Sequence, residues 1–133
     1  MDERDTYIIE MIVLNCDEIL SFISGMSYYD FIEDRKTQNA CAMSVINLGE
    51  LASVVSKDTI RNHPEVEWSG IHKFRSKTAH TYYDQKGYNL KVLWNVCSSD
   101  VPKLKSQCIS ILGDEIKSEK SYKTKKFFSF SRK

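Results

Sequence analysis

The sequence is poor in the residues that interrupt helices and lacks any long apolar run. Its 133 residues include five Gly and two Pro, which disfavours a fold of many short strands joined by turns. No stretch approaches the roughly 18 apolar residues of a membrane-spanning helix, because Glu10 interrupts the first candidate. The charged start MDERD does not resemble a secretory signal. We therefore expect one small domain in the cytoplasm, without a membrane partner.

The cysteines also exclude some classes of protein. No two of the four form a C-x-x-C pair, and without export they should stay reduced; they are Cys16, Cys41, Cys97 and Cys108. A zinc site that combined them with His63 or His72 is disfavoured because no ligand spacing fits. We expect the cysteines to be small core residues, and we expect neither a metal nor a cofactor.

Apolar residues recur with a helical period in two long stretches. Between Asp5 and Ser24 the repeating positions are Ile8, Ile12, Ile19, Phe22 and Ile23. Between Thr37 and Ser56 they are Cys41, Val45, Leu48, Ala52 and Val55. Gly49 interrupts the second stretch, where either a close helix crossing or access to a site would explain it. Both stretches predict amphipathic helices.

Shorter signals complete the predicted fold. Lys57 to Asn62 adds a helical turn before His63-Pro64 stops it. Ser69 is the predicted N-cap of a further helix, with its core at Ile71, Phe74 and Thr78. A last helix runs from about Asn89 to Ile116, and Pro102 should kink or divide it. With no convincing strand pattern, the prediction is an all-α, up-and-down bundle of four or five helices.

The segment RSKTAHTY, residues 75–82, is the strongest functional signal. Arg75 stays charged at any working pH and presents a planar fork of donors that suits phosphate oxygens. His80 can exchange a proton near neutral pH. Taken alone, an Arg and a His five residues apart are usually surface groups. On one continuous helix they would lie about 140° apart, so sharing a phosphate requires the helix to end near His80 or a second subunit to contribute.

The pattern R-x-x-x-x-H-x-Y resembles the signature of the HEPN superfamily in its HepT toxin branch. Other blocks resemble HepT-like proteins in the same order and at similar spacing, over roughly residues 5–115. They read YDFIEDRKTQN (29–39), SVINLGELA (44–52), PEVEWSGIHKF (64–74) and LWNVCSSDVPKL (93–104). Two positions depart from the family pattern: Ser76 stands where Asn is common, and Thr81 where Gly is frequent.

The resemblance implies a metal-independent endoribonuclease toxin of a bacterial toxin–antitoxin pair, a homodimer whose two motifs face one cleft. Arg75 would bind the scissile phosphate, His80 would act as general acid or base, and the RNA 2′-hydroxyl would attack the phosphorus. The implied partner is a nucleotidyltransferase antitoxin that adenylates Tyr82. Ser76 and Glu50 are possible supporting residues; a solvated charge is the alternative for Glu50. The alternative function, kept open by Ser76, is a non-catalytic module that presents nucleotide or substrate to a minimal nucleotidyltransferase.

Charge divides the chain into two parts. The last 17 residues, 117–133, hold seven Lys or Arg and one Glu, a balance of +6. The first 116 residues carry 12 basic and 17 acidic side chains, a balance of −5, which leaves the stated +1 overall. We expect a HEPN-like helical domain over residues 1–116 and a basic, aromatic-containing tail over 117–133. The tail could bind nucleic acid or dock on a protein partner.

Overall fold

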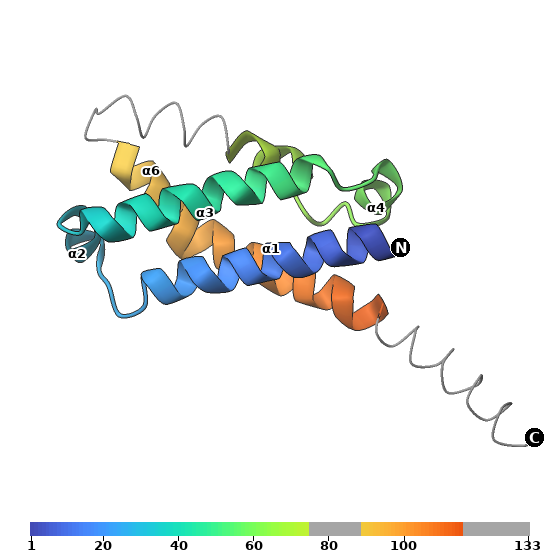
Figure 1. Cartoon of the computed structure of the whole chain (residues 1–133), viewed down its shortest axis with the longest axis horizontal. Helices are drawn as coiled ribbons and strands as arrows, with labels where there is room; N and C mark the ends of the chain where they lie inside the picture. The colour runs from blue at the N-terminus through green and yellow to red at the C-terminus, as the bar shows by residue number, and fades with distance from the viewer. Residues whose placement is uncertain (75–88, 116–133) are drawn as a thin grey trace, which may run out of the picture.

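The computed structural model describes residues 1–74 and 89–115, and every element in these ranges is helical (Figure 1). The elements are α1 (Glu3–Phe22), α2 (Tyr28–Ile32), α3 (Arg35–Ser53), α4 (Lys57–Asn62), α6 (Asn89–Asn95) and the π-helical turn η1 (Val96–Asp100). Residues 68–74 and 101–115 are also helical. The all-α prediction is confirmed. None of the helices in these ranges is long and apolar enough to cross a membrane.

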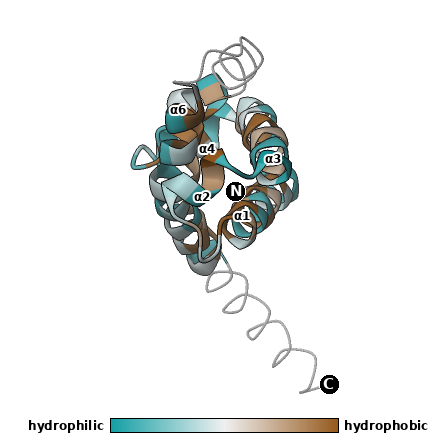
Figure 2. Ribbon diagram, turned by 90° about the vertical axis from the view of Figure 1, so that its left-hand side faces the viewer, coloured by the Kyte–Doolittle hydropathy of each residue, from teal (hydrophilic) through white to brown (hydrophobic). Residues whose placement is uncertain are grey.

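The helices α1 and α3 lie side by side and run in opposite directions, and the helical run from Asn89 to residue 115 crosses behind them (Figure 1). Hydrophobic residues gather on the inner sides of the helices (Figure 2). All four cysteines are buried, unpaired core residues, as expected. The thiols of Cys16 and Cys108 have pKa values raised to about 12 because burial disfavours the thiolate.

The first helix begins where Asp2 caps it, since the Asp5 N–H donates to Asp2 Oδ1 at 2.7 Å. Its stripe of isoleucines is buried as predicted, whereas Phe22, at the last turn, is only partly buried. The helix ends before Gly25, whose φ of 75° lies in the left-handed region that glycine adopts without strain. This glycine lets the chain turn toward α2.

The short helix α2 was not predicted as a separate element. Its N-terminus is a capping box, in which the Asp30 N–H donates to Ser27 Oγ at 3.2 Å and the Ser27 N–H to Asp30 Oδ2 at 2.9 Å. Phe31 is fully buried and lies 5.2 Å from the Trp94 ring, centroid to centroid. The buried Gln38 amide donates to the Phe31 carbonyl at 2.9 Å, so α2 is tied to both α3 and α6.

The predicted core positions in α3 are all buried, and so is Val55 just after the helix; those in α3 are Cys41, Val45, Leu48 and Ala52. The helix starts at Arg35, capped by Asp34, and its last residue is Ser53. Gly49 lies on its buried side. A short connection then leads to α4, which has the predicted bounds, with Ser56 as its N-cap.

A buried carboxylate joins α4 to α1. Asp5 is fully buried and accepts hydrogen bonds from the Ser56 N–H at 3.2 Å, from Thr59 Oγ1 at 2.6 Å and from the Ser56 hydroxyl. Burial alone would raise the pKa of Asp5, but the hydrogen bonds from Ser56 and Thr59 outweigh it and leave the pKa below its ordinary value. The start of α1 therefore fixes the start of α4.

The prediction that Ser69 caps the next helix is wrong. Residues 68–74 are helical, and the Ile71 N–H donates to the Glu67 carbonyl at 3.0 Å. Accepting this first intrahelical bond is the role of the N-cap residue, so Glu67 occupies that position and Ser69 lies inside the helix. The Trp68 indole donates to the His63 carbonyl at 2.9 Å and holds the turn before the helix.

The predicted disturbance at Pro102 takes the form of a π-helical turn. In η1 the Val101 N–H donates to the Val96 carbonyl, five residues back, and the helix continues through Pro102 to residue 115. Proline has no N–H and its ring crowds the carbonyl four residues earlier. A widened turn directly before Pro102 accommodates both effects, so the helix is distorted but not ended.

Candidate functional site

Four of the five site residues predicted from the sequence lie outside the described residues. They are Arg75, Ser76, His80 and Tyr82, all within 75–88. Their proximity, and the homodimer that would bring two motifs together, stay predictions. The basic tail from residue 117 also lies outside the described ranges. The fifth residue, Glu50, is exposed near the end of α3, where its carbonyl accepts from Ser53 Oγ at 2.6 Å. Its support of Arg75 stays a prediction too.

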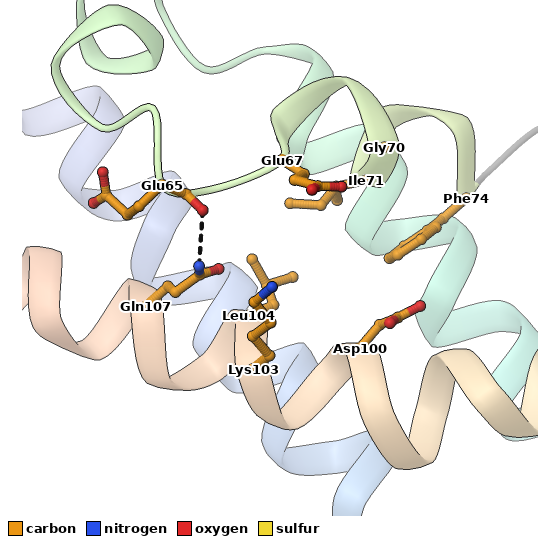
Figure 3. A pocket seen from close by; sticks show the side chains of 9 residues that line it. All are labelled: Glu65, Glu67, Gly70, Ile71, Phe74, Asp100, Lys103, Leu104 and Gln107. Carbon is orange, nitrogen blue, oxygen red and sulfur yellow. Dashed lines mark hydrogen bonds between the residues drawn. The ribbon is translucent and has the colours of Figure 1, made fainter.

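The described part of the chain before the motif closes with the helical residues 68–74, beside a pocket of about 330 Å³. One wall comes from residues 65–74 and the other from the π-helical turn and the helix after it (Figure 3). The lining residues are Glu65, Glu67, Gly70, Ile71, Phe74, Asp100, Lys103, Leu104 and Gln107. The pocket is therefore built from segments far apart in the sequence.

A hydrogen bond holds the two walls together at one end of the pocket. The Gln107 side-chain amide donates to the Glu65 carbonyl at 2.8 Å (Figure 3). Ile71 and Leu104 are buried at the floor, and Phe74 is half-buried. As the sequence predicts, Phe74 packs against the core. Its ring also borders the pocket and faces Asp100 across it (Figure 3).

Charges of both signs surround the opening. Glu67, Asp100 and Lys103 are exposed, and none of the three forms an ion pair with another residue of 1–74 or 89–115. Glu65 differs, because its carboxylate points away from the pocket and lies 3.4 Å from His63 Nδ1 (Figure 3). No group of three or more potential metal ligands occurs within these two ranges. The pocket thus offers separate acceptors and a donor rather than a chelating cluster.

The π-helical turn determines where Asp100 lies. Asp100 is the last residue of η1, two residues before Pro102. An extra residue in a helical turn rotates the following side chains relative to a regular helix. Asp100 and Lys103 are three residues apart and so share one side of the helix. Neither was singled out from the sequence; Pro102, which predicts an irregular helix here, was the available signal.

A group of aromatic side chains and one lysine lies where α2 meets α6. Tyr29 is 75% exposed and its ring centroid is 6.0 Å from that of Tyr28. Lys91 Nζ lies 4.3 Å from the Tyr28 ring centroid, a cation–π distance, and Trp94 lies 6.3 Å from Tyr28. Trp68 is buried, and Trp94 is half-buried and packs against the core.

His72 is exposed on the helical segment 68–74.

Comparisons with known proteins identify the family. The family model described as "Ribonuclease HepT-like" matches residues 12–111, and the chain belongs to this family. The matched range includes residues 75–82 and both walls of the pocket. No solved structure matches the chain.

Three relatives are similar to the chain in sequence over most of their length. "Probable ribonuclease HepT" of Thermococcus cleftensis is 33% identical over 67% of this chain and 78% of its own. "Putative RNase MJ0127" of Methanocaldococcus jannaschii is 32% identical over 68% of this chain and 73% of its own. "Putative RNase TTE0752" of Caldanaerobacter subterraneus is 28% identical over 80% of this chain and 93% of its own. All three names describe ribonucleases.

Proposed function

We propose that this protein is a metal-independent RNA endonuclease that acts through Arg75 and His80. The observation that carries the proposal is the segment RSKTAHTY, which falls within the residues that match the Ribonuclease HepT-like family. The names of the three relatives support an activity on RNA. A fixed cation and a group that titrates near neutral pH are the two side chains that such a reaction needs.

The proposed reaction uses the ribose itself as the source of the nucleophile. The 2′-hydroxyl oxygen attacks the adjacent phosphorus, and the bond from phosphorus to the 5′ oxygen breaks. His80 takes the proton from the 2′-hydroxyl as a general base or gives one to the leaving 5′ oxygen as a general acid. Arg75 binds the phosphate and stabilises the charge that builds on it in the transition state. The products are a 2′,3′-cyclic phosphate and a 5′-hydroxyl.

The proposal includes a cellular role as the toxin of a toxin–antitoxin pair. In this role a nucleotidyltransferase partner would transfer AMP from ATP to the Tyr82 hydroxyl and release pyrophosphate. The attached nucleotide would bring a phosphate toward Arg75, exclude RNA by its bulk and repel the RNA backbone by its charge. Tyr82→Phe should then resist neutralisation by this partner, as an intact-mass measurement after co-expression would show.

A homodimer is part of the same proposal. Two-fold pairs are the commonest soluble oligomers, and a second copy would bring another Arg75 and His80 to one cleft. An Arg75 and a His80 could then reach the same phosphate, although on one continuous helix they would lie on different faces.

The test compares wild-type protein with Arg75→Ala and His80→Ala on RNA in the presence of EDTA. Each variant should lose on the order of 10²-fold or more in cleavage rate, because each removes a group that acts in the transition state. Melting curves that match wild type would show that the fold is intact. His72→Ala is the matched control, since this exposed histidine lies on the helix before the motif. Equal cleavage by wild type and both variants would contradict the roles of Arg75 and His80, whereas no cleavage by the wild type would favour the non-catalytic alternative.

A further inference from the structure

We propose that the pocket beside Phe74 binds a guanine base in an unpaired stretch of the RNA. In this arrangement the Asp100 carboxylate accepts from the N1–H and the N2 amino group of guanine. The Lys103 ammonium donates to O6, and the Phe74 ring stacks on the base. The inference rests on the proposed ribonuclease function and gives that function a sequence preference.

The charges at the opening favour a base over a phosphate or a metal ion. Glu67 and Asp100 are both exposed at the opening and would repel a phosphate group. Within residues 1–74 and 89–115 no three acidic, His or Cys side chains converge as metal ligands would. A neutral heterocycle with hydrogen-bond donors on its edge avoids the repulsion and still uses the carboxylates.

The walls suit a flat aromatic ligand. Phe74 presents a half-buried ring at one side, and the buried side chains of Ile71 and Leu104 form the floor (Figure 3). Unpaired RNA bases are commonly held by stacking on such rings. The volume of about 330 Å³ lies at the lower end of the range for small-ligand pockets. It therefore suits one base rather than several.

Among the four RNA bases, guanine matches the donors and acceptors best. An ionised carboxylate only accepts hydrogen bonds and an ammonium only donates them. Guanine presents two adjacent donors, N1–H and the N2 amine, next to the acceptor O6. Adenine, cytosine and uracil each present a single donor group on the same edge. Asp100 and Lys103 lie three residues apart on one wall of the pocket, so that wall offers one acceptor and one donor to such an edge.

The position of the pocket explains how base recognition would serve cleavage. Phe74 is the residue directly before Arg75 in the chain. A base stacked on Phe74 would thus contact the chain neighbour of Arg75, the proposed phosphate ligand. Binding energy from a base beside the scissile bond orients that bond for reaction.

The experiment measures binding separately from cleavage. His80→Ala protein is titrated with fluorescent RNA pentamers that differ only at the central base: guanine, inosine, adenine or uracil. Inosine lacks only the N2 amine of guanine. We expect the guanine pentamer to bind about tenfold or more tightly than the other three, because each of these lacks at least one of the charged hydrogen bonds that guanine makes to Asp100 and Lys103.

Two further variants, each in the His80→Ala background, test whether Asp100 causes the preference for guanine. Asp100→Asn replaces an acceptor by an amide that also donates, so the ratio of guanine to inosine affinity should fall to near one. Glu65→Gln is the matched control, because its carboxylate points away from the pocket, and the ratio should persist. The ratio is the readout because removing any carboxylate strengthens the binding of all RNAs through charge alone.

Equal affinities for the four pentamers, or a guanine preference that survives Asp100→Asn, would overturn the pocket assignment. Cleavage of the same pentamers by the wild-type protein distinguishes this failure from failure of the proposed function. Cleavage without any base preference would reject the pocket and leave the ribonuclease intact. Guanine-selective binding without cleavage would keep the pocket and reject the ribonuclease.

Discussion

The junction between α1 and α4 and the pocket beside Phe74 each contain a carboxylate, in opposite circumstances. Asp5 is fully buried and accepts hydrogen bonds from Ser56 and Thr59. Asp100 is exposed, and no other residue in the described ranges forms an ion pair with it. A buried carboxylate is tolerated only when its hydrogen bonds are made. Asp5 therefore serves the fold, while Asp100 is available to a ligand.

The helices around the two carboxylates also differ in regularity. Near Asp5 the helices are regular and begin at side-chain caps on Asp2 and Ser56. Near Asp100 the helix widens into a π turn, and such turns are frequent at functional sites. The comparison predicts that changes at the α1–α4 junction alter stability, and that changes at the pocket alter binding.

The largest effect on stability is expected for Asp5→Asn. The amide keeps the size of the side chain but places a donor toward groups that already donate, so about 1.5–3 kcal/mol of unfolding free energy should be lost at pH 7. Urea denaturation measures it. Asp17→Asn is the control, because Asp17 is exposed and its pair with Lys105, at 2.5 Å, lies near the surface. That variant should lose less than about 1 kcal/mol.

The pH dependence of the free energy of unfolding tests whether the charge of Asp5 is stabilising. The pKa of Asp5 is lower in the folded protein than its ordinary value of 3.8. As pH falls, Asp5 is therefore protonated at a higher pH in the unfolded chain than in the folded protein. The stabilisation is complete above pH 3.8 and is lost as pH falls through the folded pKa. The difference between wild type and Asp5→Asn should shrink below about pH 4. A constant difference from pH 7 to pH 3 would contradict this role of the charge.

A smaller effect on stability, with a distinct effect on binding, is expected for Pro102→Ala. Alanine restores the missing N–H and relieves the clash that the π turn accommodates, so the free energy of unfolding should stay the same or rise. If the turn relaxes to a regular helix, Asp100 shifts and the preference for guanine over inosine should fall. Urea denaturation and pentamer binding measure the two effects. A less stable protein would contradict the relief of this clash, and an unchanged preference would contradict the role of the turn in positioning Asp100.

The smallest effect is expected for Gly70→Ala. Gly70 lies inside the helical residues 68–74, and a Cβ there would lie 3.7 Å from the nearest Glu67 atoms, an ordinary contact. Alanine should stabilise this helix by about 0.5–1 kcal/mol and raise the melting temperature by a few degrees. Gly25→Ala is the contrasting variant, because φ is 75° there, and it should lower the melting temperature. A lower melting temperature for Gly70→Ala than for wild type would mean that the helix has no room for the methyl group.

The regular part of the fold could be predicted from the sequence, because its signals are local and periodic. The burial of Cys41, Val45, Leu48 and Ala52 follows directly from helical spacing. The helix α2 was missed because five residues are too few for a period, although Ser27 and Asp30 carry a capping-box pattern. Ser69 was preferred as N-cap on residue type, whereas the structure places Glu67 there.

The candidate site was only partly predictable. The motif from Arg75 to Tyr82 was found because residue type and spacing carry its chemistry. The pocket depends on the packing of residues 65–74 against 100–107, and on a π turn that sets the direction of Asp100. These are tertiary effects that no local pattern encodes. Only Pro102 indicated that this helix is irregular.

The central claim is that the ribose hydroxyl of the RNA, with Arg75 and His80, performs the cleavage without a metal. Its most direct test uses an RNA oligonucleotide cut at one bond, and the same oligonucleotide with a 2′-deoxyribose on the 5′ side of that bond, both in EDTA. We expect the all-ribose strand to be cut to a 2′,3′-cyclic phosphate and a 5′-hydroxyl, and the substituted strand to stay intact. Cleavage of the substituted strand, or products that end in a 5′-phosphate, would contradict the account.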